Sequence, residues 1–198
     1  GSTVSLAGYS GGIVSKTNSS SANKTSVSKL NDIDMKPELI ETVLMNEENY
    51  NSPGTIDDIV PNVPGLYCIR IININALPKP FCSFLLERNH NIIYIGIASQ
   101  SLKKRLLSQE LRAKGHGTFF RSLGAVLGYQ PPRGSLKTKA NKKNFKFKSS
   151  DEMEIINWVN TNLQVNWVTQ NDGWDELETK FIHSYSPLLN IAKNPHAL

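Results

Sequence analysis

Cysteine, histidine and long apolar runs are scarce in this chain of 198 residues, and each scarcity excludes a class of protein. Cys68 and Cys82 are too few for a disulfide framework or a structural zinc site, and their apolar surroundings predict buried thiols. The four histidines lack metal-ligand spacing. Because no run approaches the length of a membrane span, roughly 18 apolar residues, we expect no membrane span and no membrane partner. We also expect an intracellular location.

Acidic residues are scarce where basic ones gather. Residues 63–198 carry 18 basic and nine acidic side chains, a net charge of +9, whereas residues 1–62 carry −4. The stretch 133–148 contains seven Lys or Arg and no acid. Such a domain favours a polyanion, because each neutralised phosphate releases a counterion. We therefore predict a nucleic-acid partner contacted by Lys142 and Lys143, with a solvated lysine-rich loop as the alternative.

The chain divides by composition into three parts. Residues 1–31 are rich in Ser, Asn and Thr and hold too little apolar surface to offset the entropy of ordering, which predicts a flexible arm or linker. Residues 32–62 form a lead-in, with a helix at 36–46 and an extended segment from 53 to 64. Residues 63–198 are long enough for one domain with its own core.

Three runs of β-branched and aromatic residues predict strands at 66–72, 92–97 and 165–168. Between the first two lies an insertion in which residues 81–86 are expected to extend the hairpin. A turn is predicted at 89–91, where Asn and His replace apolar residues.

Helical periodicity predicts four further helices, at about 101–113, 118–127, 151–161 and 174–185. Ser101 is the expected cap of the first, and Ser149 with Glu152 fits a capping box for the third. Strands and helices do not alternate strictly. The predicted fold is therefore α+β, with a small, mainly antiparallel sheet of three or more strands flanked by helices.

Two tyrosine motifs, Gly65–Tyr67 and Tyr94–Gly96, stand in the first two predicted strands, where neighbouring strands place the phenols side by side. A basic helical segment, Leu102–Leu106, follows, then Glu178, and finally Ser186–Asn190. In this order the five markers resemble the GIY-YIG nuclease family over about residues 63–198.

The resemblance implies a three-stranded antiparallel core and a metal-dependent endonuclease that cuts DNA, most simply double-stranded. It assigns Tyr67 as the base that activates water and Tyr94 as its hydrogen-bonding partner. Arg105 matches the family's phosphate-binding arginine, although one extra residue in the spacing leaves Lys104 as an alternative. Gly65, Gly96 and Asn190 match the residues that support the site.

The resemblance also implies one Mg²⁺ or Mn²⁺ ion on Glu178; the alternative is a surface pair between Glu178 and Lys180. One helical turn after Arg105 the family often carries His or Tyr, and here the residue is Gln109. His116, four residues after Arg112, is therefore a candidate second acid or base, with an exposed loop histidine as the alternative. Phosphate contacts are expected from Lys103, Lys104, Arg112 and Arg121.

The proposed chemistry requires a tyrosine with a lowered pKa. A free phenol has a pKa of about 10, so a base that works at neutral pH needs a pKa lower by about 3, or about 4 kcal/mol. Nearby cations or a bound metal supply such a shift. The alternative is that both tyrosines are ordinary residues of a sheet.

Two other functions stay open. One is a nucleic-acid-binding module with a degenerate site, favoured by the insertion between the strands and by Gln109. The other is an RNA-directed or effector nuclease. The cut-site specificity, nicking against double-strand cutting, and the oligomeric state are not determined by the sequence.

Overall fold

The computed structural model describes residues 35–115, 117–132 and 146–198. Within these ranges three strands form one antiparallel sheet: β1 (Gly65–Ile71), β2 (Ile92–Ala98) and β3 (Leu163–Thr169). β1 lies in the middle and pairs with both others. The three predicted strands and the α+β class are confirmed, and β3 is longer than expected.

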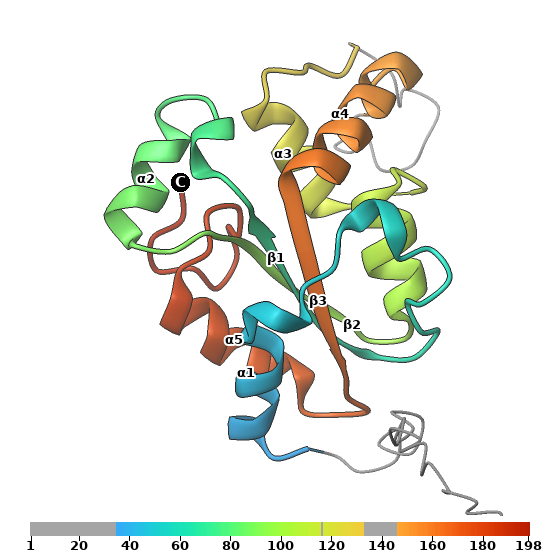
Figure 1. Ribbon diagram of the computed structural model, residues 1–198, viewed down its shortest axis with the longest axis vertical. Coiled ribbons are helices and arrows are strands. Elements are labelled where there is room, and N and C mark those ends of the chain that lie inside the picture. The colour runs from blue at the N-terminus through green and yellow to red at the C-terminus, as the bar shows by residue number, and fades with distance from the viewer. Residues whose placement is uncertain (1–34, 116, 133–145) are drawn as a thin grey trace, which may run out of the picture. The chain divides into compact units, whose positions relative to one another are not determined.

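Helices cover both faces of the sheet (Figure 1). On one face, α1 (Pro37–Met45) and α5 (Trp174–Tyr185) pack on apolar residues of all three strands. The other face is covered by α2 (Phe81–Arg88), η5 (Lys103–Leu111), α3 (Thr118–Val126) and α4 (Ser149–Asn162). All seven residues of β1 are buried, which explains its continuous apolar run.

The segment before β1 is not simply extended, as residues 53–64 were expected to be. It begins with a short 3₁₀ helix, η3 (Pro53–Thr55), and another, η2 (Glu47–Asn49), lies before it. Asn51 between them pairs with Val165 through both backbone hydrogen bonds. The described lead-in belongs to the same compact unit as the sheet, Ile33–Leu198.

The prediction of a longer hairpin at 81–86 is wrong, because this segment is helix α2, preceded by the 3₁₀ helix η4 (Ile74–Ala76). The reason is visible in the burial: Cys82 and Leu85, three residues apart, face the core, and Leu86 is exposed. The expected turn is confirmed, since Asn89 ends α2 in the left-handed conformation at φ 54°.

The capping box expected at Ser149 is also wrong. α4 begins at Ser149 itself, its N-cap is Lys148, and no side chain caps the helix. Ser149 is already the first residue of the helix, one position past the N-cap, so its hydroxyl does not occupy the capping position. Glu152 instead lies near Lys146, at 3.9 Å.

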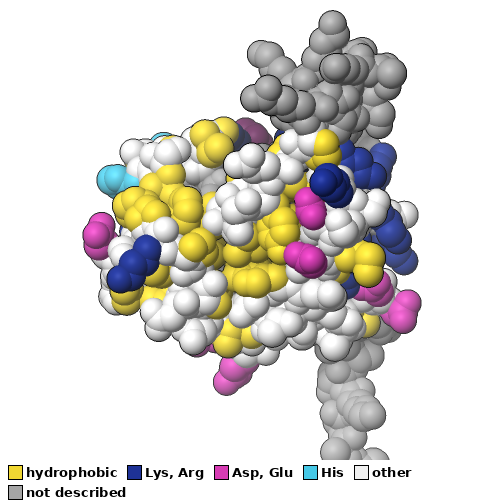
Figure 2. All heavy atoms as spheres, turned by 90° about the horizontal axis from the view of Figure 1, so that it is seen from above, with side chains coloured by type: hydrophobic (Ala, Val, Ile, Leu, Met, Phe, Trp, Pro, Cys, Tyr) yellow, Lys and Arg dark blue, Asp and Glu magenta, His cyan; other side chains and the backbone are white. Residues whose placement is uncertain are grey.

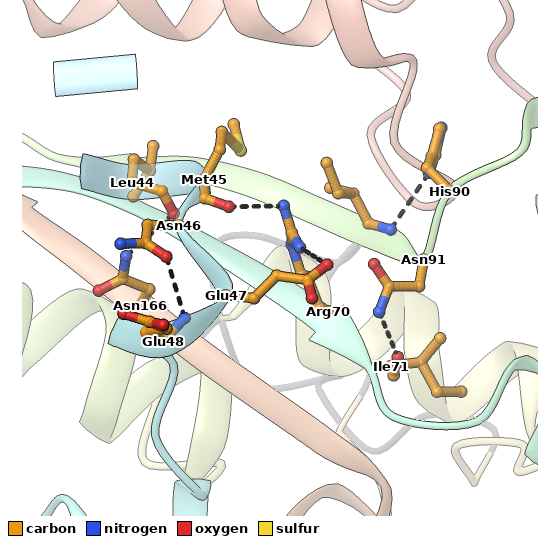
Figure 3. A network of polar contacts seen from close by, with 11 residues as sticks. Leu44, Met45, Asn46, Glu47, Glu48, Arg70, Ile71, His90, Asn91 and Asn166 are labelled. Carbon is orange, nitrogen blue, oxygen red and sulfur yellow. Dashed lines mark hydrogen bonds and ion pairs between the residues drawn. The ribbon is translucent and has the colours of Figure 1, made fainter. Parts of the chain in front are cut away.

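A polar network ties the end of α1 to the sheet (Figure 3). Arg70 of β1, only 8% exposed, donates to the Glu47 carboxylate and to the Met45 carbonyl, each at 3.0 Å. The Asn166 amide of β3 donates to the Val43 and Leu44 carbonyls at 2.9 Å. The last carbonyls of α1 therefore find partners on two strands.

Figure 2 shows the molecule from above, with hydrophobic side chains across the middle and left of that face and Lys and Arg at its edges, mainly on the right. Exposed apolar residues of the chain include Ile72, Leu86 and Met153, each more than half exposed. No helix among the described residues is both long enough and apolar enough to cross a bilayer.

Candidate active site

The two motif tyrosines lie side by side on the sheet, as their strands predict. The ring centroids of Tyr67 and Tyr94 are 6.2 Å apart with an interplanar angle of 27°. Gly96 of β2 pairs with Tyr67 of β1, and a Cβ at Gly96 would lie 2.5 Å from the Tyr67 ring and hydroxyl. Glycine is therefore required for the Tyr67 ring to cross the neighbouring strand.

Arg105 reaches this pair from η5. The Ser101 hydroxyl accepts a hydrogen bond from the Lys104 amide at 3.0 Å, so Ser101 caps the segment as predicted. Unlike the expected α-helix, η5 is a π-helix, whose i→i+5 hydrogen bonds align residues five apart. In an α-helix such residues diverge by about 140°. Arg105 and Glu110 share a side because of this geometry, and they form an ion pair at 3.0 Å.

Glu110 is a site residue that the sequence pattern missed. Its side chain is fully buried, 3.5 Å from the Tyr67 hydroxyl that donates to it. The amide of Phe120, in the first turn of α3, donates to its other oxygen at 3.3 Å. The signal in the sequence was an acid directly before Leu111 in a leucine-rich segment, but α-helical spacing hides its relation to Arg105.

Glu178 on α5 is the predicted metal ligand. Its side chain is 14% exposed and accepts a hydrogen bond from Lys193 Nζ at 3.0 Å, while Asp175 accepts from the same ammonium at 2.7 Å. The partner is thus Lys193 and not Lys180, which pairs with Glu41. No sequence motif indicated Lys193 as a residue of the site.

The electrostatics connect Glu178 to the tyrosines. The Glu178 charge contributes to the raised pKa of Tyr94, and the Arg105 charge acts on Glu178. Burial raises the pKa of the Glu178 carboxyl, and Lys193 opposes the rise. α5 and β2 are neighbours, so a residue 84 positions after Tyr94 in the chain lies within its electrostatic range.

The tyrosines do not show the lowered pKa that a base at neutral pH requires. Burial, followed by the Glu110 charge, raises the pKa of Tyr67 well above 10, and the Arg105 charge opposes this. The same causes raise the pKa of Tyr94. In this arrangement both side chains are phenols, so a proton acceptor for Tyr67 is needed.

Two of the predicted supporting residues have clear roles. The Asn190 side chain accepts from the Ile95 amide at 2.9 Å and donates to the Ile95 carbonyl at 2.8 Å, which covers the open edge of β2. A Cβ at Gly65 would lie 2.2 Å from the Val168 carbonyl oxygen. Both residues therefore hold strands in place.

A pocket of about 380 Å³ opens beside Arg105. Its polar lining comes from the segment between β2 and η5 and from η5 itself, and its walls are Ile97, Ala98, Ser99, Gln100, Ser101, Lys104, Arg105 and Gln109. The Arg105 side chain is 32% exposed, and its Nη1 donates to Gln109 at 3.1 Å. The pocket thus offers hydroxyls, amides and two cations, a set that suits a phosphate.

The other predicted contacts are dispersed. Lys103 and Lys104 are exposed on η5. Arg112 is 14% exposed and donates to the Pro53 carbonyl and to Asp57. Arg121 donates to the Gly117 carbonyl at 3.3 Å.

Three predicted residues, His116, Lys142 and Lys143, lie outside the described residues. Over the ranges that are described, no group of three or more His, Cys, Asp or Glu side chains gathers as a metal site. A metal at Glu178 would therefore take most of its ligands from water and substrate, which suits Mg²⁺. Oxygen donors and partial burial fit such an ion once the Lys193 ammonium leaves the carboxylate.

Comparison with known proteins gives one family. The profile described as GIY-YIG catalytic domain matches residues 65–198, about two thirds of the chain. No curated protein and no solved structure matches the chain.

Proposed function

Since the chain belongs to the GIY-YIG catalytic domain family, whose members are endonucleases, we propose that it hydrolyses phosphodiester bonds of double-stranded DNA with one Mg²⁺ or Mn²⁺ ion. The observation that carries the proposal is the convergence of Tyr67, Tyr94 and Arg105, with an open pocket lined by Arg105. Glu178 stands within electrostatic range of Tyr94 and Arg105. These groups come from β1, β2, η5 and α5, so only the folded chain unites them.

In the proposed reaction a water molecule attacks the phosphorus and loses a proton to Tyr67, whose own phenolic proton passes to a neighbouring acceptor, while Tyr94 hydrogen-bonds to the attacking oxygen. Arg105 binds the non-bridging oxygens, which carry the charge that develops in the transition state. The bond to the leaving oxygen breaks, and that oxygen takes a proton from solvent. General-base catalysis of this kind contributes about 10²–10⁴-fold.

Glu178 would hold the divalent ion, which, when bound, neutralises phosphate charge and polarises the scissile group. Asp175 contacts the same Lys193 ammonium as Glu178 and would add a second carboxylate charge to the region that holds the ion. His116, Lys142 and Lys143 remain part of the proposal as an additional acid or base and as phosphate contacts. An intracellular location also remains part of it.

A second candidate is a nucleic-acid-binding module that does not cut. Two observations favour it: Tyr67 has no exposed surface, and the Glu178 carboxylate is already paired with Lys193. Both features reduce the access that hydrolysis needs.

Cleavage of supercoiled plasmid with Mg²⁺ or Mn²⁺, beside matched single-stranded DNA and RNA, tests the proposal. Tyr67→Phe keeps the ring and removes the hydroxyl, so we expect cutting to fall about 10²–10⁴-fold. Tyr129→Phe is the matched control, because the Tyr129 hydroxyl also donates to a carboxylate, Glu154, at 2.7 Å.

Three outcomes contradict the proposal in different ways. Wild-type protein that binds DNA but never cuts, whatever the metal, supports the binding module. Cutting of RNA alone supports the RNA-directed nuclease. Equal cutting by Tyr67→Phe and Tyr129→Phe removes Tyr67 from the mechanism.

A further inference from the structure

A buried carboxylate lies beneath the proposed site without a role in the reaction as described. Glu110 has no exposed surface. It lies in η5 together with three buried leucines, Leu106, Leu107 and Leu111. An isolated buried charge is costly, so it persists only where it is paired and hydrogen-bonded.

The partners of Glu110 are the reacting groups themselves. Its Oε1 lies 3.0 Å from Arg105 Nη2 and 3.5 Å from the Tyr67 hydroxyl. Its Oε2 accepts from the Phe120 amide at 3.3 Å. One carboxylate therefore connects the proposed phosphate-binding cation with the proposed base.

The surrounding backbone is built around this carboxylate. A Cβ at Gly117 would lie 2.4 Å from Glu110 Oε2 and 2.4 Å from the Gln109 carbonyl oxygen. Glycine at this position lets the chain pass over Glu110 before α3 begins, and it brings the first amides of α3 to the anion.

We propose that Glu110 is a positioning residue of the nuclease reaction that orients Arg105 and accepts the Tyr67 phenolic proton when Tyr67 takes a proton from water. The inference rests on the proposed function. As the water O–H bond breaks, its proton bonds to Tyr67 Oη while the proton of Tyr67 moves to Glu110 Oε1. The water oxygen bonds to phosphorus and the leaving oxygen takes a solvent proton. Glu110 later returns its proton to solvent.

The surroundings of Glu110 allow it to carry this proton. Burial raises the pKa of the Glu110 carboxyl, while the Arg105 charge and the amides of Phe120, Phe119 and Thr118 hold it down. Tyr67 and Tyr94 are the titratable groups that face it from the strands. Because Glu110 must be ionised to accept a proton, cutting is expected to fall as pH falls through its raised pKa.

Glu110→Gln, which keeps the size of the side chain and one acceptor oxygen but removes the charge and the proton acceptor, is the decisive variant. We expect its cleavage rate to fall by about 10²-fold or more with unchanged DNA affinity, and the acidic limb of the pH–rate profile to disappear. Glu154→Gln is the matched control, since it changes another tyrosine-bound carboxylate, far from Tyr67 in the chain.

Glu110→Gln that cuts within about threefold of wild type with the same pH profile overturns the inference and leaves the proposed function standing. Should the glutamine variant not fold, Glu110→Asp decides: retained cutting with an acidic limb at a shifted pH supports proton acceptance, and loss of the limb refutes it. A wild-type protein that does not cut overturns both proposals.

A different observation carries a second inference, about the end of the chain. Lys193 has φ 63°, a left-handed conformation, and its ammonium contacts Asp175 and Glu178 at 2.7 and 3.0 Å. Arg88 donates to the His196 carbonyl at 2.7 Å, and Asn194 donates to the Pro187 and Asn190 carbonyls at 2.8 and 2.9 Å. These bonds hold the turn that delivers Lys193.

We infer that Lys193 competes with the divalent ion for Glu178 and so restrains metal binding until the C-terminal turn moves. The Lys193 ammonium occupies Oε2 of Glu178, and it repels a divalent cation placed against the same carboxylate. Metal binding and release of the turn are therefore coupled.

Titration of the protein with Mn²⁺, followed by the loss of the free-ion electron paramagnetic resonance signal, tests this without relying on cutting. We expect Lys193→Met to bind about tenfold tighter than wild type. Lys180→Met is the control, because it removes another paired lysine of the same region. Equal or weaker binding by Lys193→Met, or binding that survives Glu178→Gln, overturns the inference.

Discussion

At this site the side chains of Tyr67 and Tyr94 are held in position by the residues packed around them. Tyr67 lies across β2 with the backbone of Gly96 beneath it and the Glu110 carboxylate at its hydroxyl. Tyr94 contacts the Phe119 ring at 5.4 Å between centroids. Close packing of this kind makes the site sensitive to one added methyl group.

Gly96→Ala is expected to lower both stability and cutting. The added Cβ would lie 2.5 Å from the Tyr67 ring, so the ring has to move, at a cost of about 1–3 kcal/mol. Urea denaturation measures the first effect and plasmid cleavage the second. Gly54→Ala is the control, because its Cβ meets only the Asn160 side chain at 3.6 Å. Equal stability of the two variants would falsify the packing argument.

At the scale of elements, the site depends on how the edge strand and the π-helix are held. β2 has β1 on one side, and on its other side Leu189 donates to the Ile93 carbonyl at 2.8 Å before Asn190 pairs with Ile95. The segment after α5 thus continues the sheet by backbone and amide bonds. It also determines where the turn with Lys193 begins.

Asn190→Ala removes both hydrogen bonds to Ile95 and should lower the free energy of unfolding by about 1–3 kcal/mol. Asn190→Asp keeps an acceptor for the Ile95 amide but has no donor for the Ile95 carbonyl. We therefore expect this variant also to have a lower free energy of unfolding at neutral pH. Urea denaturation at pH 7 measures both. An alanine variant as stable as wild type would show that water replaces this edge contact.

The whole molecule extends beyond the segment that defines its family. The family match begins at residue 65, yet Ile40, Leu44, Ile56 and Val60 are at most 3% exposed and pack into the cores on the two sheet faces. The Arg70 and Asn166 bonds in Figure 3 add polar ties from the sheet to the same lead-in.

A fragment of residues 65–198 is therefore expected not to fold. Losing four buried aliphatic side chains removes about 6–12 kcal/mol of burial, comparable with the whole stability of a domain. Circular dichroism melting should show a cooperative transition for the complete chain and none for the fragment. A fragment that melts cooperatively near the temperature of the complete chain would contradict this.

The pH dependence of stability is another property of the whole molecule. The pKa of Glu110 is raised by burial, so the native state keeps its proton at a pH where the unfolded chain, with an ordinary value of about 4.3, has lost it. Stability should therefore fall as pH rises above that ordinary value, until the raised pKa is passed.

Glu110→Gln removes this titration, so the difference in unfolding free energy between wild type and variant should change with pH in that window. Denaturation in urea at several pH values measures it. Parallel curves for the two proteins would mean that Glu110 has the same pKa in both states.

Much of the site's content could be predicted from local sequence. Runs of β-branched and aromatic residues placed Tyr67 and Tyr94 on neighbouring strands, because β-propensity is a local property of the chain. Sequence reasoning failed at 81–86, where Phe, Leu and Cys suit either a strand or a buried helix face and where packing against the sheet decided.

By itself, the sequence determined the strands, most helices and the order of the motif residues, since each follows from contacts between near neighbours in the chain. Only the tertiary structure decided the partners of the charges. Glu110 contacts Tyr67, 43 residues earlier in the chain, because η5 winds as a π-helix. Glu178 contacts Lys193 because Arg88 holds the C-terminal turn through the carbonyl of His196, 108 residues later in the chain. Charge pairing in a low-dielectric interior depends on distances that chain order does not encode.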